Sequence, residues 1–154
     1  PPLPHGYFGN SIFTATPMRT VHSLVKRPLA ETAHAIRSTL HNMNDEYLRS
    51  AIDYLELQPD ITSLARGAHT FRSPNLGITS WARLPIYETE FGWGRPVSMG
   101  PAGVPFEGLA YILPPPPPPP PPASPSSSML LSITLSPNHM QRFRQLIHNF
   151  EELH

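Results

Sequence analysis

Two side chains of the stretch "HNMNDE", His41 and Asp45, have the types and the spacing that a proton-transfer pair would need. A histidine can act as a general base toward a substrate hydroxyl, and a carboxylate four positions along a helix lies on the same face. Pairs of this spacing also arise by chance, and an aspartate at the start of a helix is explained as a capping residue. We therefore interpret Asp45 as structural and expect no catalytic residue in this chain.

The other residue types that support catalysis or metal binding do not form a recognisable site. The chain contains no cysteine, which excludes a disulfide framework, a thiolate nucleophile and a Cys-type zinc site. The remaining histidines are scattered without the spacing of metal ligands; among them are His22, His34, His69, His148 and His154. We expect no metal and no bound cofactor.

The charge balance is neutral, with 11 basic and 11 acidic residues. It therefore gives no indication of a nucleic-acid partner or of an anionic membrane surface. No segment approaches the roughly 18 continuous apolar residues of a membrane span. The first residues, "PPLPHGYFGN", have no initiator Met and no features of a signal peptide, so we expect a fragment of a longer protein and a cytoplasmic setting.

Helical periodicity is visible in two regions. From Leu29 to about Leu57 it predicts two helices separated by the break "NMND", where Asn44 or Asp45 can cap the second. Pro59 ends that helix. The last helix is predicted from Ser136 as N-cap and Pro137 as its first residue, with a stripe of Met140, Phe143, Leu146, Ile147 and Phe150.

Four segments have the composition of strands. Residues 7–18 are rich in Phe, Ile and Thr between turn signals, which predicts a buried strand. Residues 76–87, 106–113 and 128–136 predict three more.

A proline-rich loop is inserted at residues 114–128, between the last two predicted strands. It opens with nine consecutive prolines, Pro114 to Pro122. Proline has no N–H for a ladder, so the run cannot be sheet and is expected to form a solvated polyproline II arm. Such an arm is either a docking peptide for an aromatic-lined groove or an expanded loop that is tolerated because loop length costs little.

Four blocks of the sequence occur together in one known family: "PPLPHGYFGN", "NDEYLRSAIDYLE", "RGAHTFRSPNLGITSWARLPI" and "EFGWGRP". In this order they resemble the C-terminal half of a plant BAHD acyltransferase. They are most similar to the hydroxycinnamoyl-CoA:shikimate/quinate hydroxycinnamoyltransferase group. The family's hallmark is DFGWG, and Glu90 stands here in place of the aspartate. The resemblance covers nearly the whole chain apart from the proline insert.

The resemblance implies an α/β fold: a two-layer α+β sandwich like chloramphenicol acetyltransferase, with helices packed on a mixed sheet. Residues 1–154 would be the C-terminal one of two such domains, with the active-site channel between them. Acyl-CoA and the acceptor alcohol are the expected substrates. The catalytic motif HHxxxDG belongs to the missing N-terminal domain and is absent here. We therefore expect the isolated chain to be inactive.

Three residues are candidates for substrate binding by this resemblance: Arg66, Thr79 and Trp81. A guanidinium can donate two parallel hydrogen bonds, which suits the carboxylate of shikimate or quinate. Thr79 and Trp81 are two positions apart and face the same side of a strand, where they would line the channel. The alternatives are a surface ion pair for Arg66 and ordinary core packing for Thr79 and Trp81.

The loop of Glu90, Phe91, Gly92, Trp93 and Gly94 has an architectural role in the family that this chain resembles. There the acidic residue pairs with an arginine just upstream of the PPLP block, and the two aromatic rings pack into the junction. Glu90 is also one methylene longer than aspartate, so a tight pair would need local adjustment, and we expect the loop to be less well fixed here. The matching arginine lies upstream of Pro1, so Glu90 is expected to lack that partner.

The leading hypothesis is the acceptor-side half of a hydroxycinnamoyl-CoA-dependent O-acyltransferase. The alternative is a non-catalytic truncated product whose polyproline arm binds a partner domain. A third hypothesis is a related family member that acylates an amine or another alcohol. In the first case, the face shaped for the missing domain would be exposed, and we expect poor solubility.

Overall fold

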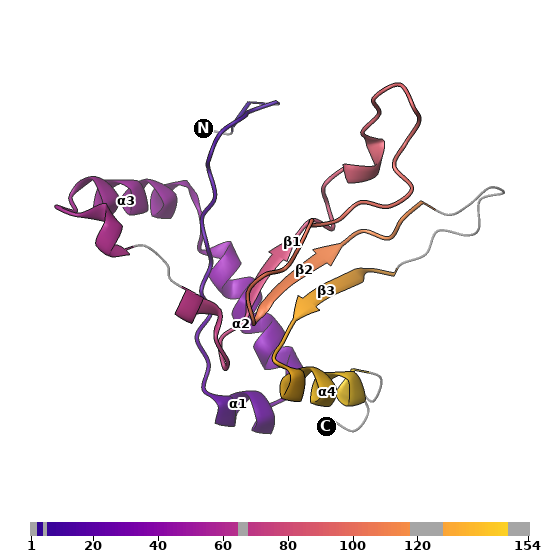
Figure 1. Cartoon of the computed structure of the whole chain (residues 1–154). Coiled ribbons are helices and arrows are strands. Elements are labelled where there is room, and N and C mark those ends of the chain that lie inside the picture. Colours follow the sequence, from indigo (N-terminus) through magenta and orange to yellow (C-terminus); the bar gives the residue numbers. More distant parts are fainter. Residues whose placement is uncertain (1–2, 5, 65–67, 118–127, 148–154) are drawn as a thin grey trace. The chain divides into compact units, whose positions relative to one another are not determined.

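The computed structural model describes residues 3–4, 6–64, 68–117 and 128–147 (Figure 1). The contacts along the chain divide it into two compact units, Pro1–Ala65 and Arg66–His154. Each unit is described by itself below. The assignment of residues 1–154 to one domain with an insert at 114–128 stays a prediction.

The first unit contains three helices: α1 (Val21–Lys26), α2 (Leu29–His41) and α3 (Asp45–Glu56). The two helices predicted between Leu29 and Leu57 are thus confirmed, while α1 was not predicted. The break between α2 and α3 falls at the expected place. The Asn44 side chain caps α3, because its Oδ1 accepts a hydrogen bond from the Tyr47 amide at 2.9 Å.

The strand predicted over residues 7–18 is wrong. These residues form no strand in the structure, and all of their side chains except the half-buried Ala15 are exposed: Phe8 fully and Ile12 to 85%. The physical reason is that a strand exists only when its backbone groups pair with a neighbour. The three strands of the described sheet all lie in the second unit and pair with one another. The composition of residues 7–18 favours extended backbone but supplies no partner.

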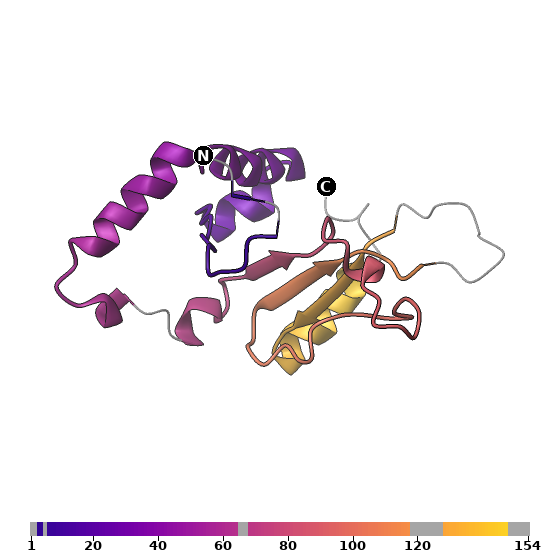
Figure 2. The same ribbon diagram turned by 90° about the horizontal axis from the view of Figure 1, so that it is seen from above.

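The second unit is built on a mixed sheet of three strands, which run side by side in both views (Figures 1 and 2). The strands are β1 (Gly77–Ser80), β2 (Leu109–Leu113) and β3 (Leu130–Thr134). β2 is central; it pairs in parallel with β1 and antiparallel with β3. The predicted α/β class with a mixed sheet is therefore confirmed.

β1 is much shorter than the predicted strand over residues 76–87. It ends at Ser80, and the chain then turns, with the Leu84 amide donating to the Trp81 carbonyl at 2.9 Å. Pro85 has no N–H and cannot extend a ladder. A short 3₁₀ helix follows at Ile86–Glu88, and two others precede the sheet at Ile61–Leu64 and Ala68–Phe71.

The buried part of the sheet lies in its central strand. Ala110 and Leu113 of β2 are 1% and 6% exposed, and with Ala35 of α2 they are the buried apolar residues among those described. A central strand is covered along both edges by its neighbours, which explains why burial concentrates there.

The start of the sheet is fixed by one glycine. The Gly108 carbonyl accepts from the Gly77 amide at 2.7 Å, and the Gly108 amide donates to the Thr134 carbonyl at 2.8 Å. Gly108 has φ +78°, a conformation that favours glycine. The rings of Phe71 and Phe106 stack close by, with centroids 6.0 Å apart.

The proline-rich residues stand in the chain between the end of β2 at Leu113 and the start of β3 at Leu130. Leu113 and Leu130 are register partners. Residues 118–127 lie outside the described part of the chain, so the expected polyproline II arm stays a prediction.

Helix α4 (Pro137–Leu146) follows β3, with two residues between them. Ser136 is its N-cap residue and Pro137 its first residue, which confirms the prediction, although Ser136 makes no capping hydrogen bond through its side chain. Met140, Phe143 and Leu146 are half-buried, as the stripe requires, whereas Phe150 lies outside the described residues. Within the described residues, no helix is long and apolar enough to cross a membrane.

Candidate functional site

The candidate site begins with Thr79 on β1. Its register partner is Tyr111 on β2, so both side chains project from the same face of the sheet. The Thr79 side chain is exposed, and its hydroxyl makes no hydrogen bond with a described residue. The hydroxyl is therefore open to solvent in this structure, and its proposed contact with a substrate stays a prediction.

Trp81 lies just beyond the end of β1 but continues the sheet's hydrogen bonding. Its backbone amide donates to the Ile112 carbonyl at 2.7 Å. The indole is half-buried and lies edge-on to the ring of Tyr111, with centroids 5.5 Å apart and planes at 75°. Because Tyr111 shares a face with Thr79, the ring contact places Trp81 on that face too. The arrangement is a small wall of one hydroxyl and two rings.

Arg66, the third candidate, lies outside the described residues. Its position relative to Thr79 and Trp81 and its proposed contact with a carboxylate remain predictions.

Tyr111 is a residue that the sequence interpretation missed. It occurs in the predicted strand at residues 106–113, but nothing local indicates which residue of another strand it faces. The register of the parallel pair decides this, and a register is set by contacts between distant segments.

The glycine-flanked loop presents its two aromatic rings to solvent. Phe91 and Trp93 are 76% and 93% exposed, so neither ring packs into a junction within the part of the chain that the structure describes. Gly92 and Gly94, on either side of Trp93, have φ +91° and +94°, a conformation that favours glycine. Glu90 forms no ion pair or hydrogen bond with a described residue, so no interaction there fixes the loop through its acidic side chain.

His41 and Asp45 do not form a catalytic pair. His41 ends α2, whereas Asp45 is the first residue of α3, and its carboxylate accepts from the Arg49 Nε at 2.8 Å. This hydrogen bond holds the pKa of Asp45 below its ordinary value. Asp45 is therefore structural, but as an ion-pair partner within α3; the capping residue is Asn44.

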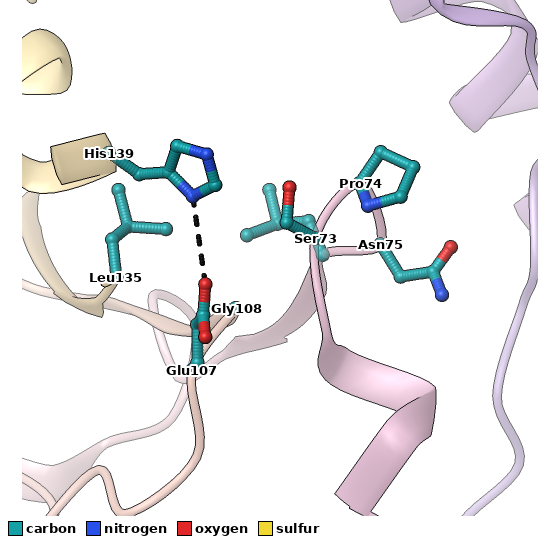
Figure 3. A pocket seen from close by; sticks show the side chains of 8 residues that line it. Ser73, Pro74, Asn75, Glu107, Gly108, Leu135 and His139 are labelled. Atoms are coloured by element: carbon teal, nitrogen blue, oxygen red, sulfur yellow. Dashed lines mark ion pairs between the residues drawn. The ribbon is translucent and has the colours of Figure 1, made fainter.

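A second feature of this unit is a shallow hollow of about 180 Å³, lined by both polar and apolar residues (Figure 3). His139 faces Glu107 across it, with Nδ1 and Oε1 3.6 Å apart, and Ser73 lies beside them. Both side chains are well exposed to solvent. The hollow lies beside Leu76, at the opposite end of β1 from Trp81, and neither Thr79 nor Trp81 lines it.

The described residues contain no group of three or more His, Asp or Glu side chains placed to bind a metal ion. The Thr79 face itself offers a hydroxyl for hydrogen bonding and aromatic surfaces for packing.

Comparison with known proteins shows the family of the chain. A profile described as the Transferase family matches residues 1–152. The chain belongs to the Transferase family. This is the BAHD family to which the four sequence blocks pointed, so that prediction is confirmed.

The relatives of this Transferase-family chain include several hydroxycinnamoyltransferases. Hydroxycinnamoyltransferase 1 of Oryza sativa subsp. japonica is 56% identical over 147 residues, which are 96% of this chain and 31% of the relative. A hydroxycinnamoyl-CoA:5-hydroxyanthranilate N-hydroxycinnamoyltransferase of Avena sativa is 54% identical with the same coverage. Shikimate O-hydroxycinnamoyltransferase of Nicotiana tabacum is 49% identical over 150 residues, 97% of this chain and 33% of the relative. The chain spans about a third of the length of these relatives.

Proposed function

We propose that this chain is the acceptor-side part of an enzyme that transfers a hydroxycinnamoyl group from its CoA thioester to a shikimate- or quinate-type alcohol. The observation that supports this proposal best is the shared face of Thr79 and Trp81 in a sequence 49% identical to a shikimate O-hydroxycinnamoyltransferase. Acyl-CoA is a co-substrate in this proposal, and no cofactor stays bound.

Each proposed residue has one role in binding. The Arg66 guanidinium pairs with the acceptor carboxylate through two parallel hydrogen bonds. The Thr79 hydroxyl donates to the acceptor oxygen or to the oxyanion that develops on the thioester carbonyl. The Trp81 indole forms an apolar wall for the acyl group. The general base that takes the acceptor proton is supplied by polypeptide outside this chain, so the chain alone is proposed to be inactive.

The nature of the acceptor separates two versions of this proposal. By its name, the Avena sativa relative acylates the amine of 5-hydroxyanthranilate. Hydroxyanthranilate carries a carboxylate, as shikimate does, so a requirement for Arg66 does not distinguish the two acceptors. The bond formed does distinguish them, because an O-acyl ester is cleaved by mild alkali and an amide is not.

The experiment combines this chain with the N-terminal two-thirds of the Oryza sativa relative and supplies p-coumaroyl-CoA with shikimate, quinate or 5-hydroxyanthranilate. We expect no product from the chain alone and an alkali-labile ester from the combination with shikimate or quinate. Arg66→Ala is expected to raise the KM for the acceptor at least about tenfold, because it removes a charge-assisted hydrogen-bonded pair with the acceptor carboxylate. Arg72→Ala, at an exposed neighbouring arginine, is the matched control.

Two outcomes would count against the proposal. Turnover by the isolated chain that depends on His41 would place the base within it. An alkali-stable product formed with 5-hydroxyanthranilate, and no product with shikimate or quinate, would make the enzyme an N-acyltransferase.

The nine consecutive prolines favour a second candidate: a non-catalytic product whose arm binds a polyproline-recognition domain. The run stands in the link between two adjacent antiparallel strands, where an extension does not interrupt the sheet. A deletion that tests this candidate is described in the Discussion.

A further inference from the structure

The indole of Trp81 needs a side chain to hold it. β1 ends at Ser80, and the one backbone bond of Trp81 to the sheet fixes its main chain but leaves the ring free to rotate about its side-chain bonds. The aromatic contact that the structure gives this ring is Tyr111, edge-on at 5.5 Å and 75°. Edge-to-face pairs are a preferred arrangement of aromatic rings, because the positive edge of one meets the negative face of the other.

The ring of Tyr111, and not its hydroxyl, makes this contact. The Tyr111 hydroxyl forms no hydrogen bond with a described residue. The main chain of Tyr111 is well fixed, because it lies at the middle of the central strand and pairs with Thr79 on one side and Ser132 on the other. Its ring is half-buried and lies edge-on to an indole that stands beyond the end of the edge strand.

We propose that Tyr111 is a positioning residue in the wall formed by Thr79, Trp81 and Tyr111. Its ring holds the Trp81 indole at a fixed angle beside Thr79. The consequence for substrates rests on the proposed function, in which Trp81 contacts the acyl group. The positioning itself is a property of this chain alone. Because the indole is already ordered before a substrate binds, binding loses less side-chain entropy.

The test uses the two tryptophans of the chain, Trp81 and Trp93. Trp93→Phe leaves Trp81 as the one reporter, at little expected cost because Trp93 is 93% exposed. In this background, time-resolved fluorescence anisotropy and near-ultraviolet circular dichroism report the order of the indole. Two variants separate ring from hydroxyl: Tyr111→Phe keeps the ring and Tyr111→Leu removes it. Tyr54→Leu, at an exposed tyrosine of α3, is the matched control.

We expect Tyr111→Phe and Tyr54→Leu to leave both signals of Trp81 unchanged. Tyr111→Leu is expected to raise the amplitude of sub-nanosecond anisotropy decay about twofold, since a freed ring moves on that timescale. An unchanged decay in a folded Tyr111→Leu protein would overturn the inference. If far-ultraviolet circular dichroism shows that Tyr111→Leu does not fold, the Trp93→Phe protein with Tyr111 intact provides the test. A large sub-nanosecond anisotropy decay of Trp81 in that protein would also overturn the inference.

A second arm separates this inference from the proposed function. Titration with p-coumaroyl-CoA is expected to quench Trp81 more strongly than CoA alone does, with a half-saturating concentration several-fold higher in Tyr111→Leu. If the anisotropy changes as expected but p-coumaroyl-CoA quenches no variant, the positioning by Tyr111 stands and the proposed role of Trp81 in acyl binding fails.

Discussion

The backbone carbonyl of Phe71 occupies the space that a β-carbon would need on Gly108. Gly108 also has φ +78° and bonds through its backbone to both Gly77 and Thr134. We therefore expect Gly108→Ala to lower the free energy of unfolding by about 2 to 4 kcal/mol, from the strained dihedral and the overlap with backbone. Urea denaturation followed by circular dichroism measures this change.

Two glycines of the same unit provide graded controls for that substitution. Gly103 has open space around it, and Gly103→Ala is expected to change stability by less than about 0.5 kcal/mol. Gly94 has open space but φ +94°, so Gly94→Ala is expected to cost about 1 kcal/mol. Equal losses at all three positions would show that close approach to Phe71 is not what requires Gly108.

The cap of α3 gives a second prediction. Asn44→Ala removes the acceptor for the Tyr47 amide, and we expect a loss of about 1 kcal/mol in helix stability. Asn44→Asp keeps an acceptor in the same place and is expected to restore it. Thermal unfolding monitored at the helical circular dichroism band is the measurement. A cap with no energetic role would make the two variants equally stable.

The ion pair of α3 predicts a change in titration. Arg49→Gln removes the charged donor that holds the pKa of Asp45 below its ordinary value, so this pKa should rise toward that value. A carboxyl with a lowered pKa stabilises the folded state above the ordinary aspartate pKa, and the contribution is lost as the pH falls through the folded value. The difference in stability between Arg49→Gln and the parent should therefore disappear in acid. NMR titration of the Asp45 carboxyl measures the shift, with Arg37→Gln as a control on α2.

The exposed loop predicts unequal access to the two tryptophans. Trp93 is 93% exposed whereas Trp81 is half-buried, so acrylamide should quench a Trp81→Phe protein more efficiently than a Trp93→Phe protein. Exposed aromatic rings also favour association, and we expect Trp93→Ser to reduce aggregation at high concentration in light scattering. Stronger quenching of Trp81 than of Trp93 would contradict the structure of this loop.

Deletion of the proline run is expected to leave folding of the chain intact and to abolish any binding of a partner to the run. Deleting Pro114 to Pro122 leaves residues 123–129, seven residues, to join the register partners Leu113 and Leu130. Hairpin connections of about two to five residues are common, so seven are sufficient and we expect the sheet to fold. If the arm binds a partner, a purified polyproline-recognition domain such as an SH3 domain or profilin should bind the parent and not the deletion protein. Equal binding to both would remove the second candidate function.

Local patterns predicted those parts of the fold that local interactions stabilise. α2, α3 and α4 follow from helical periodicity and from capping residues such as Asn44, because each helix satisfies its own backbone groups. β2 and β3 were predicted in the right places with longer bounds. The predicted strand over residues 7–18 failed because strand formation needs a partner that composition does not specify. The length of β1 was overestimated because the turn at Trp81 ends it before Pro85.

The candidate site divides in the same way. Sequence motifs alone assigned the family and selected Arg66, Thr79 and Trp81, because residue type and order along the chain are enough to recognise a family. The register that brings Tyr111 beside Thr79, the ring contact that holds Trp81 and the exposure of Trp93 were decided by tertiary structure. Each depends on which distant segments pair and which surfaces remain uncovered, and these are long-range contacts that no local pattern of residues encodes.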